Sequence, residues 1–274
     1  MALLKFNSPS TILSIPKLFV NSYTVNFGCV PDVLTTPYTT FATSPLSGAG
    51  VQDEISIKQF FKDISDQYTL GSCVANATAD ACESQLVRKS NLDPSKTPDL
   101  SRLFIYWNAR NLMNPPAATT DKGTQIYLAF DSIMRYGVPK EVTWVYDTAK
   151  VNTKPDWLSY REALQNKIKA YYRIEATGNE RVLQVIKALT SGCPVVFGTS
   201  VAASFFGVKG EVVNLPSDSF IGRHAMCITG WSASKQAFEV RNSWGLSFGV
   251  NGYCWMSKNY IAETITKDLW VPTV

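Results

Sequence analysis

Four residues with side chains suited to acyl transfer stand far apart in this sequence: Gln67, Cys73, His224 and Asn242. A cysteine thiolate is a strong nucleophile, and imidazole accepts and returns a proton near neutral pH. An asparagine amide orients an imidazole without neutralising its protonated form, and a glutamine amide can donate N–H groups to a developing oxyanion. These side chains would together support acyl-transfer chemistry, provided that the fold brings them together.

The residues after Cys73 predict a helix that begins at this cysteine and ends near Lys89, because small and apolar residues recur close to the helical period. Ser72 suits the N-cap position. In the first turn of a helix the dipole and the unpaired N–H groups favour an anion, so we expect a lowered pKa for the Cys73 thiol. The alternative is a cysteine that simply fills a small apolar position.

His224 is the only histidine, and it opens an apolar stretch that predicts a strand to Trp231. A turn centred on Ala233 would make a hairpin with a strand at 237–242, and would place Asn242 directly opposite His224. A slip of one residue would send Asn242 to the other face. The alternatives are a structural histidine and a turn asparagine.

The order of elements predicts an α+β fold. Helical patterns dominate from 51 to about 150, and strand patterns from about 165 to 265, which favours a helical lobe and an antiparallel β lobe with a cleft between them. Further helices are expected at 101–113 (capped by Ser101), 124–136, 155–170 and 181–190, and further strands at 194–201 and 252–257.

Residues 1–50 have a composition of their own, with three charged side chains, no tryptophan, and many serines, threonines and prolines. They predict an extended arm or a removable pro-segment, with short strands at 12–15 and 23–27. Residues 51–274 would then form the second, globular domain.

The composition also argues against several classes of function. The net charge of +4 is scattered, and no nucleic-acid motif or apolar run of the roughly 18 residues needed to cross a membrane is found. One histidine and six widely spaced cysteines argue against a metal site, and nothing calls for a cofactor. We expect a monomer with reduced cysteines, in a cytoplasm or a virion. The N-terminal stretch makes a poor signal peptide, although secretion stays open.

Three motifs together resemble the papain-like cysteine peptidases of the C1 family. They are Asp-Gln-x3-Gly-Ser-Cys at 66–73, His-Ala at 224–225 and Asn-Ser-Trp-Gly at 242–245. The match is closest to the prokaryotic and viral branch, whose N-terminal segment is short, and it covers roughly residues 51–265. The resemblance implies a two-lobed papain-like fold and a thiol peptidase that acts on proteins or peptides.

The resemblance also assigns roles to residues. Gln67 becomes the oxyanion residue, Cys73 the nucleophile, His224 the acid and base, and Asn242 the orienting residue. It further implies a shield for the His–Asn pair (Trp244) and substrate-binding positions at Gly71, Ser72, Gly123, Arg223 and Ala225.

Three positions depart from the common pattern of the family. Leu70 stands where many secreted members have a disulfide cysteine, and Val74 replaces an aromatic residue. Arg223 precedes the histidine, where it would either lower the imidazole pKa or read an acidic group of the substrate. The leading hypothesis is a peptidase kept latent by residues 1–50. The alternatives are a catalytically silent structural or binding protein, such as a virion component, and an isopeptidase or other acyl transferase that uses the same triad.

Overall fold

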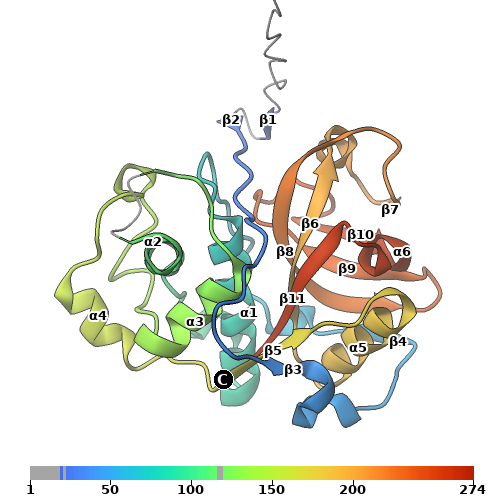
Figure 1. Cartoon of the computed structure of the whole chain (residues 1–274), viewed down its shortest axis with the longest axis horizontal. Coiled ribbons are helices and arrows are strands. Elements are labelled where there is room, and N and C mark those ends of the chain that lie inside the picture. Colours follow the sequence, from blue (N-terminus) through green and yellow to red (C-terminus); the bar gives the residue numbers. More distant parts are fainter. Residues whose placement is uncertain (1–18, 21–22, 116–119) are drawn as a thin grey trace, which may run out of the picture.

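The computed structural model describes residues 19–20, 23–115 and 120–274. Helices gather on one side and a large sheet on the other, as predicted (Figure 1). The helices are α1 (Cys73–Ser90), α2 (Arg102–Met113), α3 (Ile126–Tyr136), α4 (Trp157–Ala163), α5 (Gly178–Thr190) and α6 (Lys258–Ala262). The strands are β1 (Phe19–Val20), β2 (Tyr23–Thr24), β3 (Thr39–Thr40), β4 (Glu54–Ser56), β5 (Ala170–Ile174), β6 (Val195–Ala202), β7 (Val212–Val213), β8 (Phe220–Ser232), β9 (Ala237–Arg241), β10 (Tyr253–Ser257) and β11 (Thr266–Thr273).

The main sheet has the strand order β3-β5-β11-β6-β8-β9-β10-β7, and β4 also pairs with β8. Its pairs are antiparallel except for β3 with β5 and β10 with β7. Helices α5 and α6 pack on the sheet, whereas α2, α3 and α4 form the opposite lobe (Figure 1). The two lobes and the mixed sheet agree with the predicted α+β class.

Helix α1 runs between the lobes and is buried on all sides over most of its length (Figure 1). Every residue from Cys73 to Gln85 is buried. Alanines at alternate positions from 75 to 81 let neighbouring elements approach closely, and the helix contacts both α2 and β8. A side chain in its first turn is therefore shared by both lobes.

The other predicted helices differ from the structure mainly in their boundaries. Ser101 caps α2 by accepting the backbone N–H of Phe104, as predicted. Helix α3 ends at Gly137, whose φ of +75° suits glycine. The helix expected at 155–170 is shorter than predicted, because α4 spans Trp157–Ala163 and strand β5 begins at Ala170.

The sheet has strands that the sequence pattern did not predict. Strands β3, β4, β5, β7 and β11 were missed, and β8 begins at Phe220 rather than His224. Lys267, Asp268 and Pro272 interrupt the apolar pattern of β11, which explains why that stretch was overlooked. Pairing with neighbours on both sides, β5 and β6, decides its conformation.

The first 50 residues, where described, form an extended and irregular segment that passes between the lobes (Figure 1). The expected strand at 23–27 is reduced to β2, and the expected strand at 12–15 lies outside the described residues. Strand β3 joins the edge of the main sheet, and Phe41 is fully buried in the core. Within the described ranges, no helix is both long enough and apolar enough to cross a bilayer.

Candidate active site

Cys73 is the first residue of α1, which places its thiol where the helix pattern predicted it. Ser72 occupies the N-cap position as predicted, but its side chain makes no capping hydrogen bond to the described backbone. The Ser72 hydroxyl instead pairs with the hydroxyl of Tyr146 and accepts from the Asn76 amide at 3.1 Å. These bonds fix the turn before Cys73 by other means.

His224 and Asn242 lie in contact in the β lobe, with 2.7 Å between His224 Nε2 and Asn242 Oδ1. The same oxygen accepts the backbone N–H of Ser243 at 2.8 Å, which identifies it as the acceptor. Nε2 therefore carries the proton, and a neutral ring leaves Nδ1 as the basic nitrogen. Nδ1 is buried and has no hydrogen-bond partner among the described residues. The ring is thus held in the tautomer that can accept a proton from a thiol.

The register that predicted this contact is wrong. Strands β8 and β9 pair Ser232 with Ala237, and after an irregularity between Ile228 and Gly230 they pair Cys227 with Arg241. One more step would put Met226, rather than His224, opposite Asn242. The offset is two residues, which keeps Asn242 on the face of His224 and makes the pair a diagonal neighbour.

Aromatic rings cover the His224–Asn242 pair. The indole of Trp244 lies 4.6 Å from the imidazole, between ring centroids, and is itself fully buried. Phe206 stacks on the other face of this indole at 4.8 Å, and Phe205 meets it edge-on at 5.7 Å. This cover keeps water from competing for the amide oxygen, which strengthens the hydrogen bond.

Gln67 has both ends of its side-chain amide held by hydrogen bonds. Ser243 donates to Gln67 Oε1 at 2.9 Å, so Nε2 is the end that donates elsewhere. That nitrogen donates to the backbone oxygen of Leu70 at 2.9 Å and to that of Asn26 at 3.1 Å. One of its two hydrogens is therefore occupied by the N-terminal segment.

Residues 25–32, which we call the plug, contact three of these four side chains: Gln67, Cys73 and His224. Its Gly28 accepts from the backbone N–H of Thr124 at 2.9 Å, and Val30 donates to the Thr124 oxygen at 3.0 Å. A Cβ on Gly28 would lie 1.6 Å from the oxygen of Gly71, and a Cβ on Gly123 would lie 2.2 Å from that of Gly28. Three glycines thus let the plug approach the helical lobe at backbone distance.

The plug also touches the β lobe. Phe27 packs edge-on against His224 and Trp244, with ring centroids 6.2 and 6.4 Å apart, and it lies against the bare backbone of Gly222. The side chain of Cys29 reaches toward Gly198 on β6. As a result, Cys73 and His224 are both completely inaccessible to solvent.

Burial reverses the predicted effect on the thiol. It raises the pKa of Cys73 to about 11, although backbone N–H groups of Ala225 and Gly28, among others, lower it in part. Burial also lowers the pKa of His224 to about 4, against the opposing effect of Asn242. The expectation of a lowered thiol pKa is therefore wrong for the plugged state, since desolvation outweighs the helix N-terminus.

The other positions expected at the site are more dispersed. The backbone N–H of Ala225 points at the thiol, and that of Gly71 donates to Asp121 at 3.0 Å. Gly123 donates its N–H to the Tyr106 hydroxyl at 3.0 Å, so the backbone that pairs with the plug belongs to Thr124. Thr124 was missed, although its place directly after Gly123 was a usable signal.

Arg223 lies away from the imidazole. Its guanidinium forms an ion pair with Asp268 at 3.2 Å. Asp268 also faces Asp32 of the plug, whose carboxylate accepts the indole N–H of Trp270 at 2.7 Å. The side chain of Arg223 is therefore a partner of this carboxylate pair. Among the described residues, no group of three histidine, cysteine or acidic side chains is arranged to hold a metal ion.

The orienting hydrogen bond leads to a testable expectation. In a chain freed of its plug, Asn242→Ala should lower kcat by about 10- to 100-fold, because the imidazole loses the partner that fixes its tautomer and direction. Initial rates of peptide cleavage measure this loss. Asn259→Ala, at an exposed asparagine of α6, is the control and should leave kcat unchanged. Equal rates for the two variants would contradict the orienting role.

Comparisons with known proteins point to one family. The sequence profile of the papain family cysteine proteases matches residues 52–273. A peptidase C1-like protein of Acanthamoeba polyphaga mimivirus is 38% identical over 227 residues, which cover 79% of this chain and 71% of the viral protein. Cysteine proteinase 1 of Entamoeba histolytica is 28% identical over 195 residues, and the match covers 69% of this chain and 58% of that protein.

Solved structures agree with the sequence matches. Xylellain, a cysteine protease from Xylella fastidiosa, superimposes with a TM-score of 0.78 at 26% identity, covering 94% of this chain and 99% of xylellain. The bromelain protease from Ananas comosus, solved with the E64 inhibitor, has a TM-score of 0.65 and covers 82% of this chain and all of its own. At 21% identity the latter likeness supports the fold alone. The chain belongs to the papain family of cysteine proteases.

Proposed function

We propose that this chain hydrolyses peptide bonds with Cys73, His224, Asn242 and Gln67, and that residues 25–32 hold it latent. The observation that best supports this proposal is the 2.7 Å hydrogen bond from His224 Nε2 to Asn242 Oδ1. It leaves Nδ1 as the base, and the N–H of the next residue, Ala225, already points at the Cys73 sulfur. These two contacts support the assignment of Cys73 as nucleophile, His224 as base and Asn242 as orienting group.

Acylation would begin when Nδ1 of His224 takes the thiol proton. The sulfur of Cys73 attacks the peptide carbonyl carbon, and the carbonyl π electrons move onto its oxygen. The Gln67 amide and the Cys73 backbone N–H stabilise this oxyanion, each such donor being worth about 2.7–4 kcal/mol. When the oxyanion collapses, the C–N bond breaks and the imidazolium gives its proton to the leaving amine.

Deacylation returns the enzyme to its starting state. His224 takes a proton from water, and the hydroxide formed attacks the thioester carbonyl. The C–S bond then breaks, the carboxylic acid leaves, and the proton on the imidazole returns to the sulfur. The four proposed residues and one water molecule are sufficient for this cycle. The substrates would be proteins or peptides.

Latency would follow from the position of the plug. Gly28 turns its N–H toward the Cys73 sulfur, and its carbonyl bonds to Thr124. The carbonyl of Asn26 occupies the Gln67 donor that an oxyanion would need. A substrate carbonyl can therefore reach neither the nucleophile nor the oxyanion donor until the plug leaves.

The free cysteines support a reducing location. All six cysteines lie within the described ranges and carry free thiols, none of them in a disulfide. A cytoplasm or the interior of a virion would keep them so. The mimivirus relative makes a viral setting a natural first place to look.

An epoxysuccinyl thiol-protease inhibitor tests the proposal directly. Under reducing conditions it should label Cys73 once the plug is displaced, and Cys73→Ala should lose the label. The same plug-displaced protein, when it has not been treated with the inhibitor, should cleave members of a peptide library. Absence of both labelling and cleavage would favour a silent binding protein. Labelling of Cys73 with cleavage of isopeptide bonds alone would favour the alternative of an isopeptidase that uses the same triad.

The pKa values of the plugged state predict its reactivity. With a thiol pKa of about 11, roughly one molecule in 10⁴ carries a thiolate at pH 7. Alkylation of Cys73 by iodoacetamide should therefore be slow at pH 7 in the full chain and should rise about tenfold per pH unit toward pH 11. Peptide mapping by mass spectrometry follows the reaction. A rate that is fast and flat near pH 7 would show that the thiol is already ionised, and the plug ineffective.

A further inference from the structure

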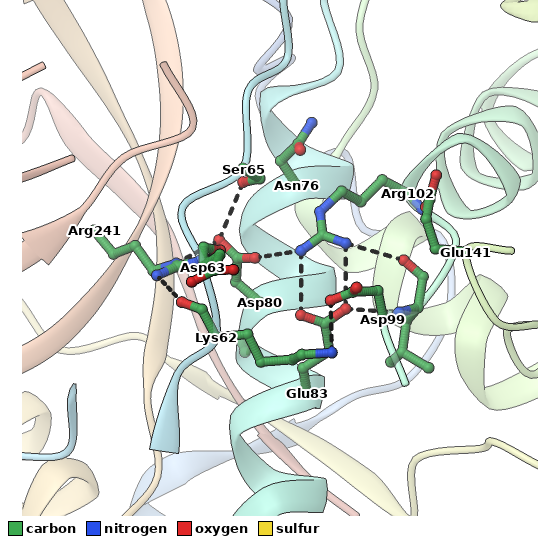
Figure 2. Close-up of polar contacts among 12 residues, drawn as sticks. Lys62, Asp63, Ser65, Asn76, Asp80, Glu83, Asp99, Arg102, Glu141 and Arg241 are labelled. Carbon is green, nitrogen blue, oxygen red and sulfur yellow. Dashed lines mark hydrogen bonds and ion pairs between the residues drawn. The ribbon is translucent and has the colours of Figure 1, made fainter. Parts of the chain in front are cut away.

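A buried cluster of charges lies along α1, about two turns beyond Cys73 (Figure 2). Asp80 and Glu83 of α1 face Arg102 of α2 and Arg241 of β9, and all four side chains are less than a tenth exposed. Arg102 lies 2.7 Å from one oxygen of Asp80 and 3.1 Å from Glu83. Arg241 lies 2.8 Å from the other oxygen of Asp80. A single carboxylate thus binds one arginine from each lobe.

Arg241 makes several hydrogen bonds in addition to its ion pair with Asp80. Its guanidinium also donates to the backbone oxygens of Lys62 and Asp63, and to the Tyr253 hydroxyl at 2.9 Å. Each of its three nitrogens therefore has a hydrogen-bond partner, which favours keeping a buried guanidinium. Lys62 and Asp63 lie on the segment that leads to Gln67. The side chain connects three parts of the site: α1, the end of β9 and the approach to the oxyanion residue.

Asp80 is the ionised carboxyl of the cluster. Burial alone would raise the pKa of this carboxyl, but Arg241 and Arg102 hold it below the usual range. Glu83 differs, since burial raises its pKa to about 7 in spite of Arg102. Asp80 is therefore the fixed negative centre of the cluster, and both lobes are attached to it.

We propose that Asp80 and Arg241 are positioning residues, which set the place of the His224–Asn242 pair relative to Cys73. This inference rests on the proposed function of that site. Arg241 directly precedes Asn242 in the chain, and Asp80 lies on the same rigid helix as Cys73. The Asp80–Arg241 pair is thus a direct polar link between the helix that carries the nucleophile and β9, which ends immediately before the orienting residue.

Such a link matters because the two halves of the triad come from different lobes. Apolar packing is non-directional and tolerates small sliding, whereas an ion pair whose guanidinium nitrogens are all hydrogen-bonded fixes both distance and direction. A misplacement of about 1 Å at a catalytic pair costs on the order of 10²-fold in rate. The cluster would therefore act on turnover rather than on substrate binding.

Arg241 and Arg102 offer a matched comparison, since both are buried arginines bound to Asp80. Arg241→Gln should lower kcat by about 10- to 100-fold with little change in KM, and should shift the acid limb of the pH profile of kcat/KM. Arg102→Gln breaks two ion pairs, those with Asp80 and Glu83, whereas Arg241→Gln breaks one, but Arg102→Gln leaves β9 attached to Asp80. It should lower the melting temperature at least as much, with kcat reduced by no more than about threefold.

The measurements use the full chain with its plug displaced by Gly28→Ala, and pair kinetics with thermal unfolding. Arg241→Lys serves if Arg241→Gln does not fold, because it keeps the positive charge beside Asp80 and loses the bonds to Lys62 and Asp63. An intermediate loss of kcat supports the proposal. Equal losses for the Arg241 and Arg102 variants, or an unshifted pH profile, would overturn it. No cleavage by the Gly28→Ala chain that carries no further substitution, together with no inhibitor labelling of its Cys73, would instead reject the proposed function itself.

Discussion

Replacing Cys73 with alanine is expected to reduce peptide hydrolysis by at least about 10⁴-fold, because the covalent route disappears with the nucleophile. The change removes one sulfur atom from a buried position, so stability should fall by no more than about 1–2 kcal/mol. Initial rates on a plug-displaced chain, together with thermal unfolding, measure the two effects separately.

Cys82 provides the control for this substitution. It lies on the same helix, is equally buried, and has no role in the proposed chemistry. Cys82→Ala should therefore show a comparable loss of stability with kcat unchanged. A Cys73→Ala chain that retains a tenth or more of the parent rate would rule out Cys73 as the nucleophile.

Substituting alanine for Gly28 should activate the full-length chain. The new Cβ would lie 1.6 Å from the oxygen of Gly71 and 2.7 Å from its Cα, and both atoms belong to backbone that cannot rotate away. Overpacking of this kind costs about 1–3 kcal/mol. That cost falls on the plugged state alone, so the unplugged fraction, and with it the rate of cleavage, should rise by about 10- to 100-fold.

Gly50→Ala is the matched control, because no other described heavy atom lies within 4 Å of a Cβ at that position. It alters the same N-terminal segment by the same methyl group and should leave the rate unchanged. The melting temperature of the body should be similar in both variants. If Gly28→Ala and the parent chain cleave peptides at the same rate, the plug does not control access.

The position of Cys73 could be predicted from sequence because the signal is local. A polar turn followed by small and apolar residues at helical spacing determines where the helix begins. The His224–Asn242 contact was predicted on a wrong register for a reason visible in the hairpin. Relative to the predicted register, the loop at 233–236 shifts the pairing by three residues, and the irregularity between Ile228 and Gly230 reduces this shift to two. The remaining offset is even, so the two side chains still share a face.

The electrostatics of the site could not be predicted from sequence in the same way. A cysteine at a helix N-terminus suggests a low pKa only while water or a charged partner is near. Here the covering residues come from about 45 positions earlier in the chain, in a stretch without periodicity or a recognisable motif and with Asp32 as its single charged residue. Only the packing of Gly28 against Gly71 and Gly123 shows that water is excluded from the thiol.

The buried position of Phe41 divides the first 50 residues into two parts with different fates. Phe41 is fully buried, and β3 just before it pairs with the edge of the main sheet. Residues 35–38, between this anchor and the plug, are exposed. A protease could cut this short link and release the plug while the sheet keeps its edge strand. The mature N-terminus would then lie near residue 38 rather than near residue 50.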